Sequence, residues 1–123
     1  MNHLDIYTFD LETHELRQLT DSPGEWDEYA QFSSTGKKIV WISSTGYGMG
    51  TARRWWNYLK TDYWIMNADG SNKTRVTFYN KEVEDGMRVI CSDCSWNVNG
   101  TKLATTMLVM DGKKVITGGI AVY

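Results

Sequence analysis

The apolar residues of this chain occur in short runs, and most runs have the period of a β-strand. Val, Ile, Thr and aromatic residues form the runs, and Gly, Asn, Asp and Ser cluster between them. No segment keeps a helical period, and the best helix candidate is the short segment 51–59. The pattern predicts an all-β fold with strands at residues 5–10, 16–20, 29–33, 38–43, 63–67, 74–77, 89–96, 102–109 and 119–123.

Two of the expected strands are apolar on both faces. Ile39 and Trp41 alternate with Val40 and Ile42, and residues 63–66 show the same pattern. A strand that is buried on one face only would alternate apolar with polar residues. We therefore expect these strands to belong to a sheet that is covered on both faces.

The chain also repeats its own pattern. Residues 62–67 (Asp-Tyr-Trp-Ile-Met-Asn) resemble residues 5–10 (Asp-Ile-Tyr-Thr-Phe-Asp) at an offset of 57, and Leu19-Thr20 then aligns with Val76-Thr77. At an offset of 64, residues 32–39 align with residues 96–103. A repeat of about 40–60 residues with four strands indicates the blade of a β-propeller.

These segments resemble the TolB-like, WD-like β-propeller repeat, whose form is D-I-Y-x-M-D…R-x-L-T…P-x-F-S-P-D-G-K-x-I. The match includes Asp5-Ile-Tyr-Thr-Phe-Asp, Arg17-Gln-Leu-Thr and Phe32-Ser…Gly36-Lys-Lys-Ile. The S-P-D-G turn departs from the family, because it is Ser-Ser-Thr-Gly at 33–36 and Asn-Val-Asn-Gly at 97–100. Both turns keep the glycine, which tolerates positive φ, and lose the rigid proline.

The resemblance implies a partial β-propeller of four-stranded antiparallel blades. Residues 1–20 are then the last two strands of one blade, and 89–123 are the first three strands of another. Residues 28–77 form one complete blade with an insertion at 45–61. A closed ring needs roughly 250 residues. The rest of the propeller is therefore expected from a longer protein or from other copies of the chain, and the end of the chain within a strand favours a fragment.

Antiparallel strands place the connections 21–28, 45–61 and 78–88 on one face, opposite the short glycine turns. Long connections often have a functional reason. For binding, Arg53, Arg54, Trp55 and Trp56 would supply positive and stacking contacts, and Glu25, Asp27, Glu84 and Asp85 would set polarity or pair with the arginines. The alternative is that the Arg-Trp segment only covers the edge of a blade.

Composition excludes several classes of partner. The net charge of −2 over 123 residues provides no basic excess for nucleic acid or for an anionic membrane. No apolar run approaches the roughly 18 residues of a membrane span, so no membrane insertion is expected. The first residues lack the features of a signal peptide. The family resemblance nevertheless implies a periplasmic or other extracytoplasmic location, typical of bacterial relatives.

The two cysteines form a C-x-x-C at 91–94, without the second pair of ligands that a zinc site needs. Residues three apart on a regular strand point to opposite faces, so two buried thiols are expected rather than a disulfide or a metal site. No metal or other cofactor is predicted.

Catalytic motifs are also missing. The sequence contains no G-x-S-x-G and no G-x-x-x-x-G-K, and His3 and His14 do not suit a general base. We therefore expect a non-catalytic binding module that holds a protein segment or a small polar ligand on its long-loop face. The alternative is a propeller domain of a larger enzyme, either a prolyl-oligopeptidase-type hydrolase or a lyase acting on acidic sugars.

Overall fold

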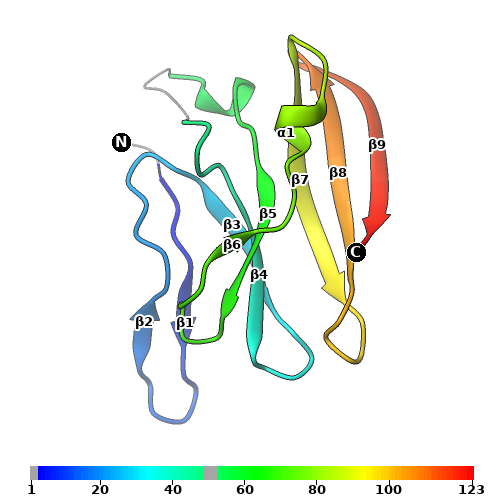
Figure 1. The fold of residues 1–123 in the computed structure, drawn as a ribbon. Helices are drawn as coiled ribbons and strands as arrows, with labels where there is room; N and C mark the ends of the chain where they lie inside the picture. Colours follow the sequence, from blue (N-terminus) through cyan, green and yellow to red (C-terminus); the bar gives the residue numbers. More distant parts are fainter. Residues whose placement is uncertain (1–2, 49–52) are drawn as a thin grey trace.

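The computed structural model describes residues 3–48 and 53–123, and these contain nine strands in three antiparallel sheets (Figure 1). The first sheet pairs β1 (Tyr7–Phe9) with β2 (Leu16–Gln18). The second contains, in chain order, β3 (Asp27–Phe32), β4 (Lys38–Ser43), β5 (Asp62–Asn67) and β6 (Thr74–Arg75). The third contains β7 (Met87–Trp96), β8 (Leu103–Asp111) and β9 (Lys114–Val122). The all-β antiparallel class predicted from the sequence is confirmed.

Three local expectations need correction. Strand β9 begins at Lys114 and not at residue 119, because Gly112, with φ of 55°, closes a tight hairpin between β8 and β9. The expected helix at 51–59 is reduced, in the described residues, to the 3-10 turn η1 (Trp55–Asn57), and residues 51–52 lie outside the described chain. The short helix α1 (Tyr79–Glu82) lies in a segment that was expected to be a loop.

The central sheet is buried on both faces, as its sequence predicts, and lies between the other two sheets (Figure 1). Toward the third sheet, one cluster joins Val40, Ile42 and Tyr63 to Val89, Cys91, Cys94 and Leu103. Toward the first sheet, a second cluster joins Ile39, Trp41 and Met66 to Ile6 and Leu19. Alternate residues of β4 and β5 thus enter different cores, because successive side chains of a strand point to opposite faces.

The first strands of the second and third sheets contain a β-bulge each. The register shifts between Glu28 and Gln31 in β3, and between Cys91 and Cys94 in β7. The bulge brings both cysteines into one apolar cluster, so the expectation that they point to opposite faces is wrong. Both thiols are buried and free, as predicted, and burial raises the pKa of Cys94 to about 11.

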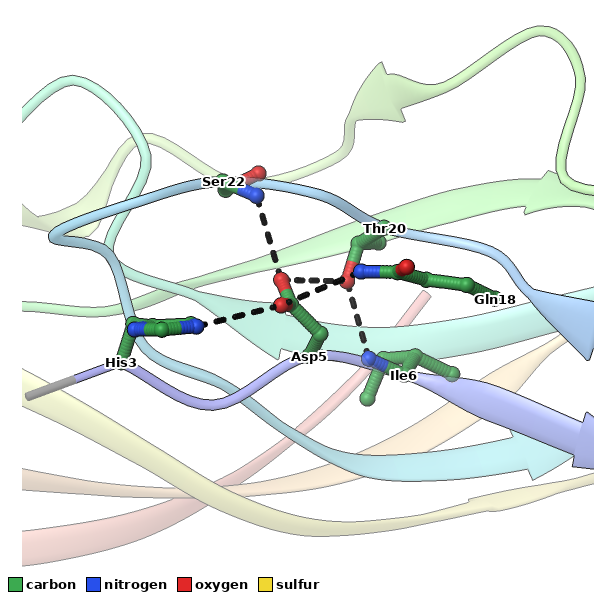
Figure 2. Close-up of polar contacts among 6 residues, drawn as sticks. All are labelled: His3, Asp5, Ile6, Gln18, Thr20 and Ser22. Atoms are coloured by element: carbon green, nitrogen blue, oxygen red, sulfur yellow. Dashed lines mark hydrogen bonds and ion pairs between the residues drawn. The ribbon is translucent and has the colours of Figure 1, made fainter.

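A polar cluster centred on Asp5 fixes the chain where it leaves the first sheet (Figure 2). The Thr20 hydroxyl accepts a hydrogen bond from Ile6 N at 2.9 Å and donates to Asp5 Oδ1 at 3.3 Å. Asp5 Oδ1 also accepts from Ser22 N at 3.1 Å. Two exposed side chains reach the other carboxylate oxygen: Gln18 at 3.4 Å and His3 at 3.7 Å.

The same bonds recur 57 residues later, around Asp62. The Thr77 hydroxyl accepts from Tyr63 N at 3.0 Å and donates to Asp62 Oδ1 at 2.9 Å. Asp62 Oδ1 also accepts from Tyr79 N at 2.9 Å. The sequence similarity at this offset therefore corresponds to one repeated unit of strand, turn and polar anchor.

Candidate ligand-binding site

The connections 21–28 and 78–88, and the described parts of 45–61 (residues 45–48 and 53–61), lie at one end of the sheets, which we call the long-loop end (Figure 1). The short turns that contain Gly36 and Gly100 lie at the other end. The hairpin turn at Gly112 also belongs to the long-loop end, because β8 runs antiparallel to β7 and returns there. The long-loop end is therefore built from four connections, one more than the sequence predicts.

The first two connections are bound to each other. The Thr45 hydroxyl donates to Glu25 Oε2 at 2.6 Å, and Trp26 N donates to the Ser44 hydroxyl at 2.8 Å. The rings of Trp26 and Trp55 have centroids 4.3 Å apart, in a tilted arrangement. Glu25 and Trp55, two of the expected binding residues, thus join one connection to the next.

Tyr47 links the second connection to the polar cluster of Asp62. Its hydroxyl donates to Asp62 Oδ2, and its ring lies 5.0 Å from the guanidinium carbon of Arg75. Arg75 also donates to the backbone oxygen of Thr45. Burial is the main cause that raises the pKa of Asp62, and the hydrogen bonds from Tyr47 and Thr77 oppose it. Tyr47 is therefore held in place from two sides.

Arg88, at the start of β7, ties three connections together. Its side chain is buried, and the residue is 7% exposed. Nη1 donates to the backbone oxygen of Leu59 at 2.9 Å, and Nη2 donates to that of Gly112 at 2.9 Å. The buried Nε has no hydrogen-bond partner in the described chain. Burial lowers the pKa of Arg88 from its ordinary value, although an arginine stays protonated in proteins.

A cavity of about 430 Å³ opens between these connections. Three glycines, at 48, 86 and 112, contribute backbone to its wall. The side chains on the wall are Tyr47, Asn57, Tyr58, Lys60, Met87 and Arg88. Two of these are cations and three are neutral polar groups, and none of the described lining residues is a carboxylate. The cavity therefore offers hydrogen-bond donors and positive charge to a ligand.

The four expected cationic and aromatic residues lie next to the cavity in sequence, but none of them lines it. Arg53 and Arg54 are exposed, and Trp56 is 52% exposed. Trp55 is half-buried between Trp26 and Trp56. In the described parts of the chain the ion pairs are His3–Asp5 and Arg17–Glu15, so neither arginine is paired with an acidic candidate.

The four expected acidic residues are dispersed. Glu84 and Asp85 are exposed and precede Gly86 at the cavity wall. Asp27 is 1% exposed and accepts a hydrogen bond from Trp41 Nε1 at 3.1 Å. Burial is the main cause that raises the pKa of Asp27. Asp27 thus belongs to the interior of the central sheet, and Glu25 is held by Thr45.

The residues that line the cavity were not among the expected binding residues. Tyr58 and Lys60 lie in the segment 45–61 that the sequence singles out, but nothing in the sequence distinguishes them from the other residues of that loop. For Arg88 the sequence does contain an indication of a special environment, because a single arginine precedes the apolar Val-Ile-Cys of a predicted strand. A cation at the buried start of a strand needs a specific set of partners.

The chain matches no protein-family model and no curated protein sequence. Over residues 3–48 and 53–123, no group of three or more His, Cys, Asp or Glu residues is placed to hold a metal ion. Within the same ranges, no helix has the length and apolar composition needed to span a membrane. Function is therefore inferred from the geometry of the long-loop end.

Proposed function

We propose that the chain is part of a TolB-like β-propeller and serves as a non-catalytic binding module. The module holds a protein segment or a small polar ligand at its long-loop end. The observation that supports this most directly is the cavity of about 430 Å³ between the connections. Ligand pockets typically have volumes of about 300–1,000 Å³, and they combine apolar walls with a few polar groups.

The arrangement of the sheets supports the propeller part of the proposal. A four-stranded antiparallel sheet with apolar clusters on both faces is what a blade between two other blades requires. The flanking sheets have two and three strands, and both expose apolar residues, among them Tyr7, Phe9, Val115 and Ile120. Exposed apolar patches mark association surfaces. We assign these surfaces to neighbouring blades, from a longer protein or from other copies of this chain.

The exposed Arg53, Arg54 and Trp56 extend the same site. They precede Asn57, which lines the cavity. A ligand longer than the cavity, such as a protein segment, would reach them. Guanidinium groups and an indole ring offer pairing and stacking contacts there.

Chemical-shift mapping on the isotope-labelled chain tests the proposal. The probes are free amino acids, N-acetylated tetra-alanine and glucose, each added separately. A bound probe is expected to shift the amide signals of residues 46–48, 57–60, 86–88 and 112, and to leave the turns around Gly36 and Gly100 unchanged. Shifts confined to those two turns, or none with any probe, would contradict the proposed site.

A matched pair of variants sharpens this test. Tyr58→Ala removes a ring from the cavity wall, and Tyr29→Ala removes an exposed ring from β3, outside the cavity. Binding that is weakened by Tyr58→Ala and not by Tyr29→Ala supports the site. The double variant Arg54→Ala/Trp55→Ala then reports whether a longer ligand uses the Arg-Trp segment.

A further inference from the structure

Arg88 is a buried cation whose charge no described carboxylate balances. Two of its five N–H groups donate to the carbonyls of Leu59 and Gly112. Carbonyl oxygens have only partial charges, and a buried charge without a counter-ion is costly. Either this cost is a plain loss of stability, or an anion that binds beside the guanidinium offsets it.

The carboxylates just before Arg88 in the chain, and the one next to Gly112, do not neutralise Arg88. Glu84, Asp85 and Asp111 are exposed, and none of them forms an ion pair within the described residues. Asp62 faces the same connections, but its oxygens accept hydrogen bonds from Tyr47, Thr77 and the backbone of Tyr79. The positive charge at the cavity wall therefore remains available to a ligand.

Lys60 places a second cation on the same wall, and the Tyr58 hydroxyl and the Asn57 amide add uncharged donors. Lys60 is half-buried. Hydrogen bonds from a charged donor to a charged acceptor are about twice as strong as neutral ones. Two cations on one cavity wall thus select for the charge of a ligand.

We infer that the cavity binds its ligand through a carboxylate group, which Arg88 and Lys60 receive. This inference rests on the proposed function and assigns the chemistry of its ligand. The planar guanidinium matches a carboxylate. A strongly charged polyanion is disfavoured by the exposed Glu84 and Asp85 beside Gly86 and by the net charge of −2. The carboxylate belongs either to a small organic acid or to the end of a peptide.

Two pairs of probes are used. The two compounds of a pair are similar in shape and differ in charge, and the two pairs represent the two sources of the carboxylate, a small organic acid and the end of a peptide. The first pair is glutarate and glutaramide, and the second is N-acetylated tetra-alanine with a free or an amidated C-terminus. Affinities are measured on the full chain by amide chemical shifts. Within at least one pair, the carboxylate is expected to bind about tenfold more tightly than its amide.

Variants identify the receiving residues. Lys60→Met is expected to reduce the affinity for the preferred carboxylate about threefold to tenfold, and Lys60→Arg is expected to restore most of it. Lys37→Met makes the same change of charge in the turn at the opposite end and serves as the control. Arg88→Lys keeps the charge but loses the fork that joins two carbonyls, so its amide spectrum must first show an intact fold. If it does, weaker carboxylate binding is expected.

The outcomes separate this inference from the proposed function. If binding occurs in the cavity but in neither pair does the carboxylate bind more tightly than its amide, the ligand-binding proposal survives and the carboxylate inference is overturned. The inference also fails if Lys60→Met and Lys37→Met have equal effects. Absence of binding by all four probes counts against both. Tighter binding of glutarate assigns the carboxylate to a small organic acid, and tighter binding of the peptide carboxylate assigns it to the end of a peptide.

Discussion

The polar clusters of Asp5 and Asp62 have the same arrangement of hydrogen bonds at two places in the chain. In each, a threonine hydroxyl joins the aspartate to a strand backbone, and a backbone N–H two residues after that threonine completes the set. The clusters differ in their outer partners. Asp5 is reached by the exposed side chains of His3 and Gln18, as Figure 2 shows, whereas Asp62 accepts from Tyr47.

Because of this difference, the second copy of the repeated unit contributes to the cavity and the first copy does not. At the position of Gln18 the second copy has Arg75, whose guanidinium lies over the rings of Tyr47, Trp64 and Phe78. Tyr47 comes from the long connection, so the second cluster fixes a cavity wall as well as a strand end. Both copies use the aspartate–threonine pair for the fold. Only the second copy adds the contacts of Tyr47 and Arg75, on which the proposed site depends.

The largest difference between the clusters is expected for removal of the aspartate. Asp62→Ala leaves Thr77, Tyr79 N and Tyr47 without their acceptor in a buried place, and we expect a loss of about 3 kcal/mol in unfolding free energy. Asp5→Ala is expected to cost about 1 kcal/mol, because water can reach the exposed partners His3 and Gln18. Urea denaturation of the two variants measures both values. Equal losses in unfolding free energy would contradict the expected difference between the two clusters.

Removal of the shared threonine is expected to cost the same in both copies. Thr20→Val and Thr77→Val each delete one bond to an aspartate and one to a strand N–H, and both residues are buried. We expect each to lower the unfolding free energy by about 2 kcal/mol. The same denaturation experiment applies, and a gap between the two variants beyond about 1 kcal/mol would show that the clusters are not equivalent.

Tyr47→Phe tests the partner that only the second cluster has. It removes the hydroxyl bond to Asp62 and keeps the ring over Arg75, so a loss of about 1 kcal/mol is expected. Tyr29→Phe is the control, because Tyr29 is exposed and its ring is retained. An unchanged midpoint for Tyr47→Phe would mean that the hydroxyl contributes nothing to stability.

The smallest expected effect is a dependence on pH. Burial raises the pKa of Asp62 in the folded chain above its ordinary value of 3.8. The folded state then binds the proton more readily than the unfolded state, so this group's contribution is largest at low pH and falls as pH rises through the raised pKa. The stability of the wild type relative to Asp62→Asn should therefore decrease as the pH rises from 3.8 toward the raised pKa. A difference that increases with pH would show that the hydrogen bonds to the carboxylate outweigh its burial.

Much of the fold could be read from particular residues. The alternation of Ile39, Val40, Trp41 and Ile42 predicted a sheet with two buried faces, and the structure places these residues in two separate clusters. The strand near the C-terminus was harder. Its Lys-Val-Ile-Thr start is exposed, and its limit depends on the hairpin at Gly112. The Asp111-Gly112 pair indicates such a hairpin, but the expected strand at 119–123 did not take it into account.

The position of the long connections at one end was predictable, but the side chains that line the cavity there were not. Sequence-local properties, such as strand period, strand direction and the glycine turns, gathered the long connections at one end. Contacts between segments far apart in the chain then decided which side chains point toward the interior. Trp55 is held against Trp26, Glu25 is engaged by Thr45, and Asp27 is buried under Trp41.

The sequence by itself thus determined the all-β class, most of the strands and the repeat at an offset of 57, because each depends on the pattern of residues within one strand or one short turn. Only the tertiary structure decided that Arg88 lies buried between Leu59 and Gly112, beside Lys60 and a cavity. The burial and hydrogen bonding of a charged side chain depend on the segments packed around it, and those come from three different connections.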